Sequence, residues 1–234
     1  MNERINLRKF ADREALAQAL AVETADALRA AIGTGAAATL AVSGGSTPAK
    51  FFRALSGAEL DWESVAVTLV DERWVPETSD RSNARLVKQN LLQNDASAAS
   101  FTPLFTGADS PEEGLDEADQ RIADLHGPLT VAFLGMGSDG HTASFFPGGD
   151  HLAEAIDIAG KALVAPMHAA AAGEPRITLT LPVLIAAETL ILHIEGQDKL
   201  EVLEKALAGE DPREMPIRAV IAASPRPLDV VWAP

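Results

Sequence analysis

Residues 134–149 read LGMGSDGHTASFFPGG, and they follow an apolar run at residues 129–134 that contains β-branched and aromatic side chains. Such a run is typical of a buried strand. Gly135, Gly137 and Gly140 would let the chain turn sharply at the end of that strand and would leave backbone N–H groups open to a ligand. We therefore predict a strand that ends at a functional site.

Asp139 and His141 stand in this turn, separated by one glycine. A histidine titrates near neutrality, and a carboxylate on its other ring nitrogen would fix its tautomer and raise its basicity. The pattern predicts a general base, His141, oriented by Asp139. A solvent-facing loop histidine is the alternative, but the surrounding glycines and a second candidate site elsewhere in the chain favour the base.

The three glycines also spell G-x-G-x-x-G after a strand, which is the dinucleotide-binding fingerprint. That fingerprint requires a full helix next, with its N-terminus on the pyrophosphate and an acid about twenty residues further on. Pro147, Gly148 and Gly149 would stop any helix after barely two turns. The sequence therefore argues against a nicotinamide-dependent dehydrogenase.

The composition is that of a strongly acidic globular chain. With 234 residues, 47% of them hydrophobic, it can bury a large core, and we expect a single domain over residues 1–234. Its 19 Lys and Arg against 34 Asp and Glu give a net charge of −15, which argues against nucleic acid or anionic lipid as a partner.

The chain has no cysteine, so disulfides, thiolate nucleophiles and Cys-based zinc sites are excluded, and the composition indicates no cofactor site. No stretch approaches the roughly twenty apolar residues of a membrane span, and the N-terminus lacks a long apolar stretch. We expect a cytoplasmic protein without a membrane partner, acting on a small molecule as a monomer or weak homo-oligomer.

A second candidate site follows the apolar run at residues 37–42. Glycines there would permit close backbone approach, the hydroxyl residues would cap a helix at residues 49–55, and Pro48 suits its first turn. An anion would meet free N–H groups and the positive end of the helix dipole. Because the histidine turn is a second candidate site in the same chain, we favour phosphate binding over a strand-to-helix turn that binds no ligand. The predicted phosphate residues are Ser43, Gly44, Gly45, Ser46 and Thr47.

A third candidate site follows the β-branched run at residues 65–70, where Asp71, Glu72 and Arg73 come next. Ligands bind at strand carboxyl ends in open α/β sheets, and an arginine can hold phosphate with two hydrogen bonds. The alternative is an Arg–Asp contact that only stabilises the loop and binds no ligand. Asn83, at the start of the next predicted helix, could point into the same cleft.

Lys199 lies in the first turn of a predicted helix, where the dipole disfavours a cation. An anionic ligand would explain it, and a solvated surface lysine is the alternative. Residues 169–173 are small and could form a mobile cover for the site. The other four histidines, His126, His151, His168 and His193, have no comparable surroundings and are interpreted as surface or satisfied core residues.

Strand and helix signals alternate along the chain, which predicts a doubly wound, mostly parallel α/β sheet with its cleft at the strand carboxyl ends. The three candidate loops could all meet there. Further helices are expected at residues 12–32, 82–92, 110–125 and 183–187 and up to residue 207. Strands are expected at residues 162–165, 177–182, 189–194 and 228–232, and a loop at residues 95–109, with about eleven residues before the first helix.

The ordered motifs SGGSTP (43–48), VDERWVP (70–76), SNARL (82–86), GMGSDGHTASFFPG (135–148), RITLTLP (176–182) and GQDK (196–199) resemble the 6-phosphogluconolactonase family of the glucosamine-6-phosphate isomerase superfamily. The resemblance implies hydrolysis of 6-phospho-D-glucono-1,5-lactone in the oxidative pentose phosphate pathway, without metal or organic cofactor. It further implies that His141 activates water and that phosphate sits on the residue 44–47 turn. Arg73, Arg176 and Lys199 become candidate cationic contacts, and Asp71 would orient Arg73 or bind a hydroxyl.

Two other functions compete with the lactonase. The related deaminases, as a family, carry threonine at the position of Gly45, tyrosine at that of Arg73 and an acid at that of Phe146, and a phenyl ring cannot assist proton transfer. Sugar-phosphate sensors of bacterial regulators share the sheet but normally carry a DNA-binding module, which this sequence lacks. The lactonase is favoured over both.

Overall fold

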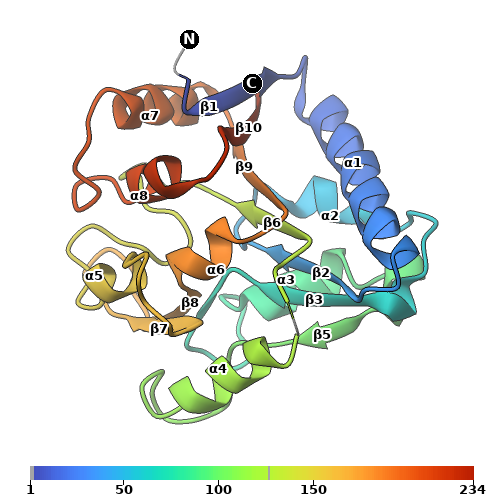
Figure 1. Cartoon of the computed structure of the whole chain (residues 1–234), viewed down its shortest axis with the longest axis horizontal. Coiled ribbons are helices and arrows are strands. Elements are labelled where there is room, and N and C mark those ends of the chain that lie inside the picture. The colour runs from blue at the N-terminus through green and yellow to red at the C-terminus, as the bar shows by residue number, and fades with distance from the viewer. Residues whose placement is uncertain (1–2, 126) are drawn as a thin grey trace.

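A computed structural model describes residues 3–125 and 127–234 and has a seven-stranded parallel sheet at its centre (Figure 1). The strand order is β1-β10-β9-β6-β2-β3-β5, and every neighbouring pair is parallel. The strands span Ile5–Lys9 (β1), Ala38–Val42 (β2), Val65–Leu69 (β3), Ser100–Thr102 (β5), Val131–Leu134 (β6), Thr189–Glu195 (β9) and Leu228–Ala233 (β10). The predicted fold class is confirmed.

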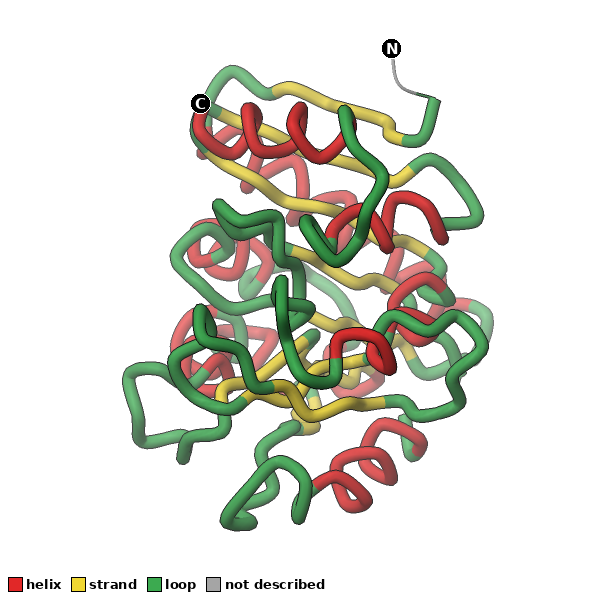
Figure 2. Tube along the Cα trace, turned by 90° about the vertical axis from the view of Figure 1, so that its left-hand side faces the viewer, coloured by secondary structure: helices red, strands yellow, loops and turns green. Residues whose placement is uncertain are grey.

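Helices cover both faces of this sheet, as the views in Figures 1 and 2 show. On one side α1 packs against α2 and α2 against α3, and on the other side α6 and α7 both contact α8. Right-handed crossovers explain why the two groups of helices lie on opposite faces. The chain moves across the sheet in one direction through β3 and β5 and in the opposite direction from β6 through β9 to β10, so its crossover helices lie on different faces. The helices span Arg13–Gly33 (α1), Ala49–Leu55 (α2), Asn83–Asn90 (α3), Leu115–Ala123 (α4), Leu152–Ala155 (α5), Leu181–Ile185 (α6), Gln197–Leu207 (α7) and Ile217–Ala223 (α8), with 3₁₀ turns at Trp62–Ser64 and Asn94–Ala98.

The central strands form because both of their faces are buried. Every residue of β2 and β6 is buried, which is why these strands read as continuous apolar runs instead of alternating ones. The strand order reverses between β2 and β6, since β2 is followed by strands on one side of it while β6 lies on the other. A ligand cleft is expected at such a switch point, next to the strand carboxyl ends.

A second, antiparallel sheet of three strands lies beside the first and was not predicted. It has the order β4-β8-β7, with β4 at Asp71–Arg73, β8 at Arg176–Leu179 and β7 at Val164–Met167. The register places Arg73 opposite Arg176 and Asp71 opposite Thr178. This pairing brings two predicted site segments, more than 100 residues apart in sequence, to one edge of the cleft.

Several predicted boundaries were wrong. The edge strand β5 lies inside the predicted loop at residues 95–109, and β1 precedes the first helix. The helix predicted from residue 110 begins only at Leu115, because Ser110 caps a preceding turn through its contact with the Glu113 N–H, 3.2 Å. Pro166 lies within β7 instead of ending it, which is tolerated because β7 is an edge strand.

Glu72 fastens the small sheet to the start of α3. Its fully buried carboxylate accepts hydrogen bonds from the N–H groups of Arg73, Asn83 and Ala84, at 2.7–2.8 Å, and from the Ser82 hydroxyl at 3.0 Å. Negative charge at a helix N-terminus is favourable, since it satisfies N–H groups that the helix leaves unpaired. The carboxylate thereby fixes where Asn83 lies.

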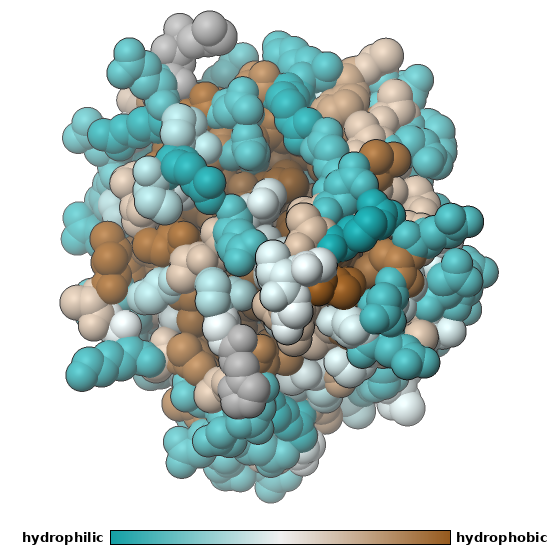
Figure 3. Space-filling view, turned by 45° about the vertical axis from the view of Figure 1, so that its right-hand side comes forward, coloured by the Kyte–Doolittle hydropathy of each residue, from teal (hydrophilic) through white to brown (hydrophobic). Residues whose placement is uncertain are grey.

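The molecular surface carries many polar side chains. Figure 3 shows hydrophilic side chains over much of one face, with apolar residues visible between them. Within the described ranges, no helix combines the length and apolar character needed to cross a bilayer.

Candidate active site

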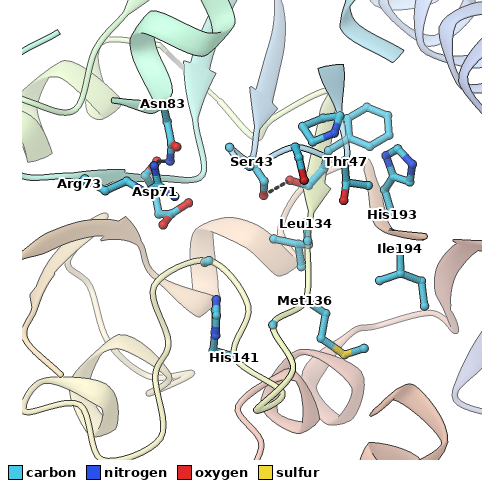
Figure 4. Close-up of a pocket in the computed structure, with 18 of the residues that line it drawn as sticks. Ser43, Thr47, Asp71, Arg73, Asn83, Leu134, Met136, His141, His193 and Ile194 are labelled. Carbon is cyan, nitrogen blue, oxygen red and sulfur yellow. Dashed lines mark hydrogen bonds between the residues drawn. The ribbon is translucent and has the colours of Figure 1, made fainter. Parts of the chain in front are cut away.

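A cleft of about 370 Å³ opens at the switch point between β2 and β6. Two segments that we call the SGGST turn (residues 43–47) and the histidine loop (residues 135–141) contribute to its wall. Asp71, Arg73, Arg176 and Lys199 also line it, so every predicted site residue faces this cleft except Asp139, which stands beside the histidine. Figure 4 shows the ring of His141 and the SGGST turn in the wall of this one cavity.

The histidine loop holds His141 by its Nδ1 edge. Asp139 Oδ1 lies 2.6 Å from His141 Nδ1 and accepts a hydrogen bond from the His141 backbone N–H at 3.1 Å. The predicted pairing is therefore present, and it leaves Nε2 as the nitrogen available to a substrate. The His141 side chain keeps 31% of its surface exposed, so solvent reaches it.

The environment keeps Asp139 charged. Burial by itself would raise the pKa of Asp139, but the hydrogen bond from the His141 N–H and the interactions with its ring outweigh burial and lower it. A side chain at Gly137 would meet the His141 ring, since an added Cβ would lie 2.2 Å from Nδ1 and Cε1. The glycine is thus required for the ring to lie as it does.

The SGGST turn is tied to the neighbouring strand but leaves its own donors open. The Ser43 hydroxyl donates to the Phe133 carbonyl at 2.7 Å, the dashed line in Figure 4, and Gly45 adopts φ +94°. Among the described residues, the N–H groups of Gly44 to Thr47 have no hydrogen-bond partner. The predicted helix cap by Ser46 or Thr47 was wrong, because α2 begins after Pro48 without any side-chain cap.

The opposite wall is built on Asp71. This buried carboxylate accepts a hydrogen bond from the Ser144 hydroxyl at 2.6 Å and lies 3.8 Å from Arg176 Nη1. Arg73 donates instead to the Arg81 carbonyl, and its buried Nε has no hydrogen-bond partner in the part of the chain that the structure describes. The structure therefore shows neither an Arg73–Asp71 contact that stabilises the loop nor an orientation of Arg73 by Asp71.

Arg176 is almost fully buried, also donates to the Ala172 carbonyl at 2.7 Å, and its Nε lacks a partner among the described residues. Burial lowers the pKa of Arg176, the Asp71 carboxylate opposes that shift and the charge of Arg73 adds to it. This wall of the cleft thus carries two guanidinium groups, those of Arg73 and Arg176, and the Asp71 carboxylate, a polar lining suited to an oxygen-rich ligand.

Comparison with known proteins identifies the family. A family model described as glucosamine-6-phosphate isomerases/6-phosphogluconolactonase matches residues 11–232. The chain belongs to this family. It is 54% identical over 229 residues to a 6-phosphogluconolactonase of Mesorhizobium japonicum, covering 98% of this chain and 95% of that protein, and 52% identical to one of Rhizobium meliloti, covering 98% and 99%. The crystal structure of a 6-phosphogluconolactonase from Shewanella baltica matches with a TM-score of 0.96, 40% identity and full coverage of both chains.

Within this isomerase/lactonase fold, Lys199 lies in the first turn of α7 and lines the cleft. It forms no ion pair with any described residue, although the chain is rich in acids. The interpretation as a lysine kept for an anionic ligand is thus compatible with its position. Residues 169–173 contribute Ala171 and Ala172 to the cleft wall, and their mobility stays a prediction.

Four further polar residues line the cleft beyond those predicted as ligands: Arg81, Asn83, His193 and Glu195. Asn83 does point into the cleft wall, where its amide donates to the Asp71 carbonyl at 2.8 Å. His193 is a core residue, but it is not satisfied, because Nε2 has no hydrogen-bond partner in the described chain. His151 and His168 are partly exposed and lie beside Glu154 and Glu112, whereas His126 lies outside the described residues. No cluster of three or more His, Cys, Asp or Glu suited to a metal occurs in the described ranges.

Proposed function

We propose that this chain hydrolyses 6-phospho-D-glucono-1,5-lactone to 6-phospho-D-gluconate, as a 6-phosphogluconolactonase of the oxidative pentose phosphate pathway. The single observation that carries the proposal is the common cleft, which places an imidazole oriented by a carboxylate opposite a turn with open N–H donors. The names of the relatives, at up to 54% identity over nearly the whole chain, support the same reaction. A cytoplasmic location is part of the proposal, since charged sugar phosphates are retained inside cells.

In the proposed reaction His141 acts as the general base. Its Nε2 removes a proton from a water molecule as the water oxygen attacks the lactone carbonyl carbon. The tetrahedral intermediate then collapses, the bond between that carbon and the ring oxygen breaks, and the imidazolium returns the proton to the ring oxygen. The product acid ionises and releases one proton to solution. General base assistance of this kind contributes about 10² to 10⁴ in rate.

The developing oxyanion needs a donor. The N–H groups of Gly137 and Gly140 already donate to the carbonyls of His141 and Gly137, at 2.8 and 3.1 Å, so they are not free for this role. Arg73 lines the cleft and forms no ion pair with Asp71, and we assign its guanidinium to the oxyanion. Asp71 and Arg176 on the same wall would bind the sugar hydroxyls.

The phosphate would lie on the SGGST turn, with Lys199 as its cation. Open backbone N–H groups and a lysine are a common way to hold phosphate. Local positive charge is needed here, because the net charge of −15 repels a dianionic substrate at long range. Association should therefore depend on ionic strength.

The test is a pH-stat assay with freshly prepared lactone. We expect acid release well above the spontaneous rate, and His141→Ala should abolish most of it with little change in KM. His151→Ala, a partly exposed histidine elsewhere, is the matched control. Wild-type turnover in His141→Ala would remove that residue from the mechanism. Ammonia release from glucosamine 6-phosphate would indicate the deaminase instead, and thermal stabilisation by sugar phosphates without turnover would indicate a sensor.

A further inference from the structure

His193 is a polar side chain without a hydrogen-bond partner in the wall of the cleft. It lies in β9, is 5% exposed, and its buried Nε2 forms no hydrogen bond to a described residue. The Glu195 carboxylate lies 3.3 Å from Nε2, whereas Nδ1 has no hydrogen-bond partner among the described residues. Because buried polar atoms in proteins are nearly always paired, an imidazole with an open nitrogen in a binding cleft needs an explanation. The reaction proposed above makes no use of it.

The imidazole lies at the phosphate end of the cleft. Its ring stands edge-on to Phe51 of α2, with centroids 6.5 Å apart and planes at 84°, and Phe51 follows Thr47 by four residues in the segment that begins with the SGGST turn. Figure 4 shows His193 beside Thr47, whereas Asp71, Arg73 and His141 are seen on the other side of the cavity. Lys199 follows His193 by six residues and lines the same cleft.

Glu195 connects this histidine to Arg13. Its Oε1 lies 3.3 Å from His193 Nε2, its Oε2 lies 3.4 Å from Arg13 Nη1, and only 9% of its side chain is exposed. Glu195 also lines the cleft, where an uncompensated carboxylate would repel a phosphate. A carboxylate in that place is compatible with anion binding only if cationic neighbours outweigh its charge, and Arg13 and a protonated His193 would do so.

We propose that His193, oriented by Glu195, binds the phosphate group of the substrate. In the bound state Nε2–H faces Glu195 and Nδ1–H donates to a phosphate oxygen. Nδ1 is available for this contact, because no described residue hydrogen-bonds to it. The inference rests on the function proposed above and adds a residue that recognises the phosphate, not the lactone.

The direction in which KM changes in Glu195→Gln distinguishes the two possible roles of Glu195. If Glu195 serves only as an acid in the cleft wall, its neutralisation removes a repulsion and lowers KM for 6-phosphogluconolactone. If it holds His193 protonated and oriented, the same change raises KM, by about threefold, because a charge-assisted hydrogen bond to phosphate is weakened. In the second case kcat should stay close to the wild-type value.

His193→Phe removes both ring nitrogens while keeping an aromatic ring against Phe51. We expect KM to rise about tenfold with little change in kcat, and His193→Asn, which keeps a neutral donor, to fall between this variant and wild type. Competitive inhibitors separate phosphate recognition from a general loss of packing. The inhibition constant of inorganic phosphate should rise in both variants, whereas that of gluconate, which lacks the phosphate, should not change. His151→Asn is the control and should behave as wild type.

A lower KM in Glu195→Gln, or an equal loss of phosphate and gluconate inhibition in the His193 variants, would overturn the inference. If His193→Phe does not fold, Glu195→Gln and His193→Asn still decide the question. The two proposals fail separately. A wild-type chain without lactonase turnover would refute the proposed function, whereas an active wild type with these contrary variant results would refute only the role of His193.

Discussion

The imidazole of His141 lies against the phenyl ring of Phe146, with ring centroids 4.4 Å apart and an angle of 33° between the planes. The guanidinium carbon of Arg176 lies over the same phenyl ring, 5.4 Å from its centroid. Phe146 is 2% exposed and fixed by packing. His141 is thus held at its Nδ1 edge by Asp139 and on its face by Phe146, and two site residues from different elements share one aromatic neighbour.

Phe146→Leu should lower kcat about tenfold, because the imidazole loses the surface that fixes its plane and a small misplacement of a catalytic group is costly. KM should change less than kcat, since Phe146 offers the substrate no polar group and affects binding only through Arg176, which its contacts with Asp71 and Ala172 still hold. Phe146→Tyr keeps the ring and should retain most of the activity. Steady-state kinetics of the three proteins provide the check, and a Leu variant with wild-type kcat would show that packing on this face does not matter.

Asp139→Asn should lower kcat about 10²-fold, because the amide cannot replace the carboxylate in fixing the tautomer of His141. The pKa of Asp139 is lowered, so its charge is present above the ordinary carboxyl range and is lost only as the pH falls through the lowered value. Asp139 itself therefore stays charged from about pH 6 to pH 8, so its own ionisation does not alter the deficit across this range. Asp150→Asn is the matched control, since Asp150 also accepts a hydrogen bond from a histidine backbone N–H but lies outside the cleft. Equal losses in both variants would contradict the assignment.

The central strands were predictable because their burial is visible in the sequence. Strands β2, β3 and β6 lie inside the sheet and read as apolar runs of four to six residues. The edge strands β1 and β5 carry no such signal. β1 mixes exposed polar residues such as Asn6 with half-buried ones, and β5 has only three residues, so tertiary pairing alone determines both.

The site was predictable where a loop directly follows a central strand, as with Ser43 and the histidine loop. Arg176 was predicted as a site residue only through the family resemblance, because the antiparallel β4–β8 pairing joins segments far apart in sequence and leaves no local pattern. His193 was missed because no glycine or turn residue flanks it. Glu195 is the sequence feature that could have indicated His193, because residues two apart in a strand point to the same face.

Arg81 and Glu174 form an ion pair between the loop before α3 and the loop before β8, with N–O distances of 2.7 and 3.0 Å. The hydrogen bond from Arg81 is the main cause that lowers the pKa of Glu174 to about 2. Because the folded pKa lies below the ordinary one, the stability from this pair is complete above about pH 5 and is lost as the pH falls toward 2. Partly exposed pairs of this kind contribute about 0.2 to 1 kcal/mol.

Glu174→Gln should therefore lower the melting temperature slightly and by a constant amount at pH 7 and pH 5. The difference from wild type should narrow as the pH falls below about 4.5, since the wild-type pair is then lost as well. Thermal denaturation of both proteins across this range gives the comparison. A gap that widens in acid would mean that Glu174 acts through another contact.

Glu72→Gln tests how the start of α3 is anchored. Glu72 accepts four hydrogen bonds, and the glutamine amide would place N–H donors against the Ala84 N–H, which would be left unpaired in a buried position. A buried unpaired donor costs about 1 to 3 kcal/mol, so the free energy of unfolding should fall by about 2 kcal/mol in urea denaturation.

Glu77→Gln, which breaks the partly exposed pair with Lys88, should cost less than about 1 kcal/mol. Since Glu72 also positions Asn83 beside Asp71, we expect KM to rise in Glu72→Gln and not in Glu77→Gln; equal effects of the two substitutions on stability and KM would show that the anchor is unimportant.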